Sequence, residues 1–329
     1  MNNKKILITG GTGTLGNAFV NEIYKKFKPK KLIIYSRDEF KQSEMAKKFP
    51  SNKYPGIRFF LGDVRDKARL KVALQNINYV VHAAALKQVP VAEYNPQECI
   101  KTNILGAQNL IDACIENNVE KVIALSTDKA ANPINLYGAS KLVSDKLFIS
   151  SNILSAHVKT VFSVVRYGNV INSRGSVIPL FKEISMRQGI LPITDMKMTR
   201  FFITIENAVK FIIRSFTLMK GGEVFVPKLP SLKIYDLAKS VSSKAKVKVI
   251  GIRPGEKLHE CLFSKEESLN AYEDKSSYVI LPQVLLPNRN ISKKNIKKFK
   301  KIKSGFEYNS LTNKNYLDKK TIIKILKKF

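Results

Sequence analysis

The chain has 329 residues, 44% of them hydrophobic, so it can bury a large core and does not have the composition of a disordered protein. Its formal net charge is +31, which suggests nucleic acid or an anionic membrane surface as possible partners. The excess is mostly lysine, spread along the chain, without an RNA-binding or zinc motif. It therefore favours a solvated basic surface over specific nucleic-acid recognition.

The cysteines Cys99, Cys114 and Cys261 are odd in number, widely spaced and lack metal-ligand spacing, which suits a reducing compartment. No apolar run approaches the roughly eighteen residues that a membrane span needs. The start, MNNKKILITGG, has too short an apolar part for a secretory signal. We therefore expect a cytoplasmic protein with no membrane span and no metal site.

In chain order, the first half alternates short apolar runs with segments of helical period. The first run is followed by a helix over 14–27, with Leu15, Phe19 and Ile23 on one face. Strands are predicted at residues 4–10, 31–36, 58–63, 79–85, 121–127 and 162–170. Such repeated strand–helix units predict an α/β fold: a doubly wound parallel (Rossmann) sheet with a smaller C-terminal substrate-binding lobe.

The regular alternation ends near Asn169, where glycines, prolines and short turns become frequent. We expect a Rossmann domain over 1–168 and, over 169–329, mainly a substrate-binding lobe that ends in a lysine-rich tail. The segment 199–220 contains a helical pattern that we expect to return to the first domain. A cleft between the two parts is then the natural ligand site.

The stretch ITGGTGTLG puts glycines at three-residue intervals between the first predicted strand and helix. Glycines at this junction permit a tight turn and let the backbone approach a pyrophosphate, which the helix N-terminus stabilises. The turn therefore predicts dinucleotide binding. Its candidate cofactor-binding residues are Gly10, Thr12, Gly13, Thr14, Leu15 and Gly16.

The position about twenty residues after the turn indicates which dinucleotide binds, because an NAD site usually has an acid there. Here Ser36 and Arg37 occupy it, and Lys41 lies one helical turn further. These residues suit a 2′-phosphate, so NADP is favoured over NAD. Asp38 leaves NAD possible, and Ser36 with Glu39 also fits a capping box that opens a helix.

Tyr137 and Lys141 are four residues apart in a helical pattern, so their side chains share a face. A lysine ammonium beside a phenol favours the phenolate, and we expect Tyr137 to titrate far below its usual value of roughly 10. Such a tyrosine can take a hydroxyl proton while hydride leaves the same carbon. Thr127, at the end of a predicted strand, can hydrogen-bond the same hydroxyl.

The glycine turn, Thr127 and YGASK resemble the extended short-chain dehydrogenases that act on nucleotide sugars, and the Thr-Asp-X triplet resembles their 4,6-dehydratases. Several stretches closely resemble the inverting UDP-N-acetylglucosamine 4,6-dehydratases that open pseudaminic acid synthesis. The resemblance runs from about Lys5 to Glu267. Its motifs are LSTDKAANPINLYGASK, HAAALKQVPVAEYNP, KTNILGA, RYGNVINSRGSVIP, MTRFF and IRPGEKLHE.

By this resemblance, NADP oxidises carbon 4, water is lost across carbons 5 and 6, and the hydride returns to carbon 6. Asp128 is then the acid for the leaving hydroxyl, and Lys129 replaces the glutamate that is the base in ordinary members. Lys129 must be neutral, and we expect burial near Lys141 and the cationic nicotinamide to lower its pKa. Either Lys129 or Tyr137 returns a proton to the opposite face of carbon 5.

The resemblance also implies the binding residues and partners. UDP-N-acetylglucosamine is the substrate, and a homo-oligomer, plausibly a hexamer, is expected. Lys87 lies between cofactor and sugar. The further cofactor-binding candidates are Asp63, Val64, Ala83, Ala85, Thr102, Tyr137 and Lys141. The substrate-binding candidates are Lys87, Asn169, Arg174, Ser176, Val177, Arg200, Arg253 and Glu256.

Three alternatives remain open. The related inverting dehydratases of capsular N-acetylfucosamine synthesis share much of this pattern, whereas the membrane-bound non-inverting relatives have Met where Tyr137 stands. A UDP-sugar 4-epimerase needs the Tyr-Lys pair but not an acid and base after Thr127. A cofactor-binding scaffold with a basic surface predicts decayed catalytic residues, and these are intact.

Overall fold

The computed structural model describes residues 1–329 except 172, 174, 188, 284–298 and 328–329. Its helices are α1 (Thr14–Lys26), α2 (Glu39–Lys48), α3 (Lys67–Ala73), α4 (Val89–Tyr94), α5 (Pro96–Ile100), α6 (Gly106–Glu116), α7 (Leu136–Leu154), α8 (Val177–Arg187), α9 (Ile205–Leu218), α10 (Ile234–Val241) and α11 (Lys319–Leu326). Three short helical turns are η1 (Lys101–Leu105), η2 (Asp128–Ala130) and η3 (Glu267–Asn270).

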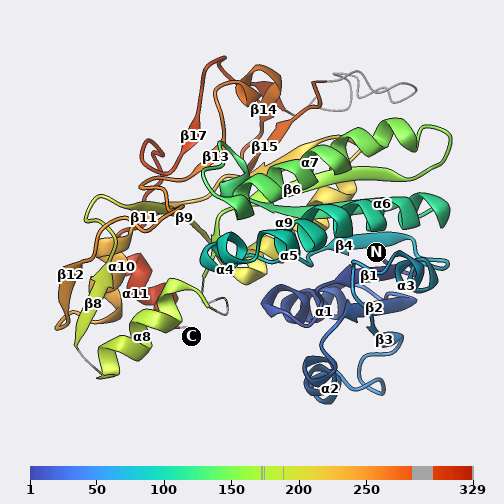
Figure 1. The fold of residues 1–329 in the computed structure, drawn as a ribbon, viewed down its shortest axis with the longest axis horizontal. Coiled ribbons are helices and arrows are strands. Elements are labelled where there is room, and N and C mark those ends of the chain that lie inside the picture. The colour runs from blue at the N-terminus through green and yellow to red at the C-terminus, as the bar shows by residue number, and fades with distance from the viewer. Residues whose placement is uncertain (172, 174, 188, 284–298, 328–329) are drawn as a thin grey trace.

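The strands are β1 (Lys5–Thr9), β2 (Lys31–Ser36), β3 (Ile57–Leu61), β4 (Tyr79–His82), β5 (Lys121–Thr127), β6 (Val161–Tyr167), β7 (Asn169–Val170), β8 (Ile190–Ile193), β9 (Thr199–Ile203), β10 (Val224–Pro227), β11 (Ser231–Lys233), β12 (Lys246–Val249), β13 (Cys261–Phe263), β14 (Ala271–Glu273), β15 (Ser277–Ile280), β16 (Lys300–Lys301) and β17 (Tyr308–Asn309). Figure 1 shows how they are arranged.

Within the described residues, the largest sheet has the order β16-β14-β15-β10-β6-β5-β4-β1-β2-β3. The strands from β3 to β10 in this order pair in parallel, and β15, β14 and β16 add an antiparallel edge. The order reverses between β1 and β4, which is where ligands bind in doubly wound sheets. The predicted fold class is confirmed.

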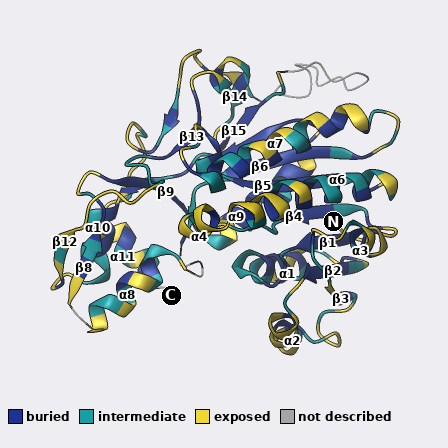
Figure 2. Ribbon diagram, in the orientation of Figure 1, coloured by how far each residue is buried: buried dark blue, intermediate teal, exposed yellow. Residues whose placement is uncertain are grey.

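Helices cover both faces of this sheet. One core contains side chains of α3, α6 and α7, and the other contains side chains of α1, α2 and α9. The strands between them are almost continuously apolar, as expected for parallel strands buried on both sides. Figure 2 shows the sheet buried and the outer helix faces exposed. Helix α9 packs against α1 and β5.

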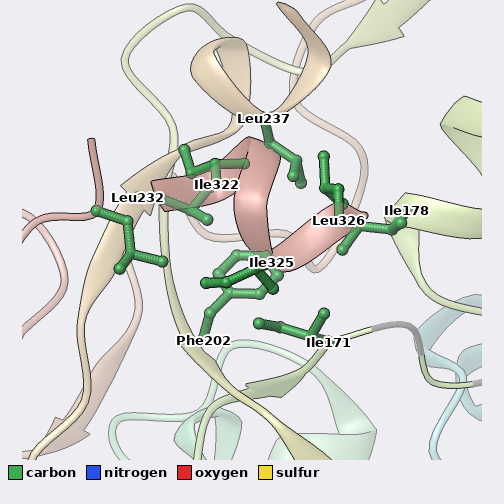
Figure 3. A pocket seen from close by; sticks show the side chains of 9 residues that line it. Ile171, Ile178, Phe202, Leu232, Leu237, Ile322, Ile325 and Leu326 are labelled. Carbon is green, nitrogen blue, oxygen red and sulfur yellow. The ribbon is translucent and has the colours of Figure 1, made fainter. Parts of the chain in front are cut away.

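A smaller lobe with its own apolar core lies beside the sheet, at the left of Figure 1. It contains α8, α10, α11 and the paired strands β8 and β12. Figure 3 shows Ile322, Ile325 and Leu326 of α11 pointing among apolar side chains such as Phe202 and Leu237. The last helix of the chain therefore completes the core of this lobe.

The predicted strand over 162–170 is divided in the structure. It ends as β6 at Tyr167, and β7 joins a second sheet with β9 and β11. Gly168 lies at the break, where an added Cβ would approach the Cβ of Phe201 to 2.6 Å. Only glycine fits this close approach, and the break turns the chain from the large sheet toward the small lobe.

Candidate active site

A cleft of about 1040 Å³ opens where the parallel strands end, between the large sheet and the small lobe. Its walls include residues that follow β1, β2, β4, β5 and β6, together with residues of α7 and α8 and of the loop before β13. The carboxyl ends of parallel strands meet here, so residues far apart in the sequence converge.

The glycine turn forms one end of the cleft. Gly10 has a φ of +64°, and an added Cβ would lie 2.9 Å from the backbone of Ala84. An added Cβ at Gly16 would lie 1.8 Å from the carbonyl oxygen of Gly11. Gly13 caps α1 without a side-chain hydrogen bond, so the first N–H groups of this helix are available to an anion. This cradle fits a pyrophosphate.

The expected ribose-phosphate side of the site carries two basic side chains, Arg37 and Lys41, and two acidic ones, Asp38 and Asp63. Asp38, not Ser36, caps α2: its carboxylate accepts from the Lys41 backbone N–H at 2.9 Å and pairs with Lys41 Nζ at 2.5 Å. The capping box expected from Ser36 is therefore wrong. The Arg37 side chain is 58% exposed and lies 3.9 Å from Asp63.

Asp63 itself is held by Arg65, whose Nε and Nη2 donate to one carboxylate oxygen at 3.0 and 2.7 Å. Asp63 and Val64 line the cleft, as do Ala83, Ala85, Lys87 and Thr102. The hydroxyl of Thr102 is buried and has no hydrogen-bond partner among the described residues. Burial lowers the pKa of Lys87.

The acid–base candidates lie at the carboxyl end of β5. Thr127 is the last residue of the strand, and its hydroxyl donates to Asp128 Oδ1 at 2.9 Å. Lys129 Nζ donates to the same oxygen at 3.0 Å. Asp128 is 1% exposed, and its Oδ2 has no partner among the described residues. The structure thus brings these three residues together at the cleft.

A second carboxylate reaches Lys129 from the segment that leads into β13. Glu260 Oε1 lies 3.1 Å from Lys129 Nζ, and Glu260 is also buried. Burial alone would lower the pKa of Lys129, but Asp128 and Glu260 together raise it. Burial raises the pKa of Asp128. The charge of Lys129 opposes this shift, and the charge of Glu260 adds to it. The expected lowering of the Lys129 pKa is therefore wrong for this arrangement, because two anions hold its ammonium.

Tyr137 is the second residue of α7 and is half-buried. The side chain of Asn135 caps the helix by accepting from the Gly138 N–H at 2.7 Å, and Glu93 accepts from the Leu136 N–H at 2.7 Å. Burial raises the pKa of Tyr137 to about 12, although the charge of Lys129 and a hydrogen bond with Thr127 oppose the rise. The expected low pKa is therefore wrong for this arrangement.

Lys141 lies one turn further along α7 and is 4% exposed. Burial lowers its pKa, and the nearby Asp145 opposes the shift. Asp145 accepts from Ser126 at 2.7 Å and pairs with the buried Arg166 at 3.3 Å. Arg166 in turn pairs with Glu267 at 2.9 Å. Asp145, Arg166 and the half-buried Glu267 thus form a chain of paired charges that begins next to Lys141.

The substrate-side candidates lie at the other end of the cleft. Asn169, Ser176 and Val177 line it, at the start of β7 and of α8. Asn169 Oδ1 and Ser176 Oγ are buried and have no partner among the described residues, so both are available to a ligand. Arg174 lies outside the described residues.

Arg200 and Arg253 also line the cleft, but they differ in what they hold. Arg200 is 6% exposed and donates to the backbone carbonyls of Thr199, Leu258 and Lys257 at 2.7–3.1 Å. Most of its donors are therefore used inside the protein. Arg253, 63% exposed, forms a two-point contact with Glu256 at 2.8 and 3.1 Å and keeps its remaining donors toward solvent.

The sequence analysis missed Glu260, Glu93 and Asn135 as parts of the site. Each is a polar residue inside a quoted motif, and that position was the available signal. Nothing local in the sequence indicates that Glu260 contacts Lys129 or that Asn135 also donates to the Gly255 carbonyl at 2.7 Å. These contacts depend on how the two lobes meet.

A parallel sheet of this order, with a glycine turn after β1 and a Tyr-Lys pair at the cleft, defines an extended short-chain dehydrogenase fold. The chain belongs to the family described as "Polysaccharide biosynthesis protein", which matches residues 6–282.

The chain is similar along most of its length to two relatives and to one solved structure. UDP-N-acetylglucosamine 4,6-dehydratase (inverting) of Campylobacter jejuni (strain 81-176) is 53% identical over 99% of this chain and 98% of its own. UDP-glucose 4-epimerase of Rickettsia bellii is 45% identical over 85% and 83%. The solved structure of Pen from Bacillus thuringiensis is 35% identical, with a TM-score of 0.89 over 100% of this chain and 99% of that one.

Two features are absent from the part of the chain that the structure describes. No helix in that part of the chain is long and apolar enough to cross a membrane. Among the same residues, no group of three or more His, Cys, Asp or Glu side chains could hold a metal ion.

Proposed function

We propose that this protein is a UDP-N-acetylglucosamine 4,6-dehydratase that inverts carbon 5, a lyase that forms UDP-2-acetamido-2,6-dideoxy-β-L-arabino-hex-4-ulose. The observation that carries the proposal is the Asp128–Lys129 contact beside Thr127 and Tyr137 in the cleft. Oxidation and reduction alone do not need such a pair, whereas elimination needs an acid and a base. The Campylobacter jejuni relative is named for this activity.

The cleft would hold NADP through the glycine turn, with Arg37 and Lys41 toward the 2′-phosphate and Thr102 as a further donor. When bound, the cofactor accepts hydride from carbon 4 of the sugar and returns it to carbon 6. Tyr137 takes the proton of the carbon 4 hydroxyl, and the charge of Lys129 favours its phenolate. Thr127 orients that hydroxyl.

Elimination then needs neutral Lys129 and protonated Asp128. The 3.0 Å contact lets one proton pass from the Lys129 ammonium to Asp128, whose pKa is raised by burial. Lys129 then removes the proton from carbon 5, and Asp128 protonates the carbon 6 hydroxyl as its bond to carbon breaks. Water leaves and a carbon 5–carbon 6 double bond forms. Protonation of carbon 5 on the opposite face, by Lys129 or Tyr137, inverts it.

Several finer statements belong to the same proposal. Asn169, Ser176, Val177, Arg253 and Glu256 would bind the UDP part of the substrate. The product would enter pseudaminic acid synthesis. We propose a cytoplasmic homo-oligomer, plausibly a hexamer, in which residues 1–168 bind the cofactor and most of 169–329 binds substrate.

The test is an NMR time course of the purified protein with UDP-N-acetylglucosamine in deuterated water, first without added cofactor and then with NADP. We expect a 4-keto-6-deoxy sugar of L-arabino configuration, deuterated at carbon 5. Lys129→Ala should lose this product by a factor of about 10² or more, since general base catalysis contributes that much. Lys47→Ala, which changes an exposed lysine of α2, should not.

A second candidate function is a UDP-sugar 4-epimerase, which the 45% identity to the Rickettsia bellii epimerase favours. In the same spectra it would produce the carbon 4 epimer, with no deuterium at carbon 5. That outcome, with Lys129→Ala still active, would refute the dehydratase and the roles given to Asp128 and Lys129.

A further inference from the structure

The segment between Arg253 and β13 contacts the loop that carries the acid–base pair at three points. Asn135 donates to the carbonyl of Gly255 at 2.7 Å, and Lys257 Nζ donates to the carbonyl of Ala131 at 2.7 Å. The third contact is the ion pair of Glu260 with Lys129. Two of these contacts are to backbone and fix the loop, whereas the third reaches a candidate catalytic group.

Glu260 is buried and is anchored through its backbone. Its backbone N–H donates to Ser310 Oγ at 2.9 Å, and Ser310 is bonded in turn to Thr199 at 2.7 Å. Its side chain is 2% exposed, against 22% for Lys129. The carboxylate of Glu260 is therefore more deeply buried than the amine of Lys129.

We propose that Glu260 is a positioning residue for the dehydration step: from the segment that leads into β13 it holds the Lys129 amine against Asp128 and keeps a transferable proton on that pair. This inference rests on the proposed function. It assigns a role in the reaction to a residue that does not itself need to touch the sugar.

The charges around Glu260 support this role. Lys129 from η2, Arg200 from β9 and Lys257 from its own segment lower its pKa against the effect of burial, so it stays an anion. Arg200 Nε lies 3.8 Å from Glu260 Oε1, further than Lys129. Asp128 is the other anion next to Lys129. Glu260 is therefore the charge that keeps Lys129 and Asp128 from losing their shared proton.

The sign of the effect follows from the charge. The active pair carries one proton, on Lys129 or on Asp128, and activity falls when rising pH removes it. An anion at Glu260 opposes this loss. Neutral Gln at the same place removes the opposition, so the alkaline limb of the pH–rate profile should move to lower pH. An opposite charge at this distance shifts a pKa by about one unit or more.

The experiment measures dehydration by NMR across pH for the wild type, Glu260→Gln and Glu260→Asp, with KM and kcat separated. For Glu260→Gln we expect the alkaline limb to move by about one unit and kcat to fall about tenfold with little change in KM. Glu260→Asp keeps the charge but shortens the reach, so kcat should fall while the alkaline limb stays near that of the wild type.

Tyr137 and Lys141 on α7 are titratable groups that also face the cleft, so the control must alter a buried carboxylate elsewhere. Glu223 is 3% exposed and accepts from Ser163 and from backbone N–H groups outside the cleft. Glu223→Gln should keep the wild-type profile. A Glu260→Gln profile that matches the wild type, or an equal shift in Glu223→Gln, would overturn the role of Glu260.

A second measurement does not depend on turnover. Because the pKa of Glu260 is lowered by folding, its stabilisation is present above the ordinary glutamate pKa of about 4.5 and is lost as pH falls through the folded value. The difference in unfolding free energy between wild type and Glu260→Gln should therefore narrow as pH falls below about 4.5. A constant difference would refute the ion pair. Absence of product from the wild type would instead refute the proposed function alone.

Discussion

Gly138 offers a sharp test of how the catalytic loop is placed. It lies in the first turn of α7, where alanine normally stabilises a helix by about 0.5–1 kcal/mol relative to glycine. An added Cβ would, however, lie 2.2 Å from the carbonyl oxygen of Lys129. Ordinary contact requires roughly 1 Å more, so either the loop of Lys129 or the start of α7 must move.

For Gly138→Ala we therefore expect a net loss of about 1–3 kcal/mol of stability, the usual effect of overpacking. We also expect a loss of about 10² in activity, because a displacement of 1 Å can cost that much at a catalytic group. Urea unfolding and the NMR assay of dehydration measure the two effects.

Gly305→Ala is the control. Gly305 has a φ of +80° and nothing near its would-be Cβ, so alanine there should cost about 1 kcal/mol through backbone strain and leave activity unchanged. A Gly138→Ala protein that is more stable than the wild type and fully active would refute the packing argument.

Two further predictions concern the cofactor end of the cleft and the core of the small lobe. Arg37→Ala should weaken NADP binding about tenfold and leave NAD binding unchanged, because among the described residues this exposed guanidinium has one ion pair, with Asp63 at 3.9 Å, and can also bind the 2′-phosphate. Calorimetry checks this, and equal losses would contradict it. Ile322→Ala should lower the unfolding free energy of the small lobe by about 2–5 kcal/mol, because Ile322 is 2% exposed in that core. Lys324→Ala, exposed on the same helix, should change it little in urea unfolding, and similar values for both would disprove the packing of α11.

The sequence predicted the parallel part of the fold well. The strands expected at 31–36 and 121–127 have the same bounds as β2 and β5, because continuous apolar runs between helices are typical of buried parallel strands. It did not reveal β14, β15 and β16, which are too short for a periodic pattern, or the break at Gly168, which depends on the approach of Phe201.

For the candidate site too, the sequence predicts one part correctly and misses another: it identifies the residues but not their protonation states. Thr127, Asp128, Lys129 and Tyr137 were found because they lie close together in one stretch, and the cleft contains all four. The protonation states were not predicted correctly, because they depend on burial and on Glu260, which lies far along the chain. Local spacing reports which groups can meet, but the charge on each is set by the complete site.

The ion pair also gives a physical reason why lysine stands at position 129. With glutamate there, as in the ordinary Thr-Asp-Glu pattern, Asp128, Glu260 and the new carboxylate would crowd into one buried place, and at least one would be forced to stay protonated. Lysine removes that repulsion, because its amine contacts both carboxylates and shares a proton with Asp128. Lys129 and Glu260 therefore act as one unit, and a substitution at either position should change what the other can do.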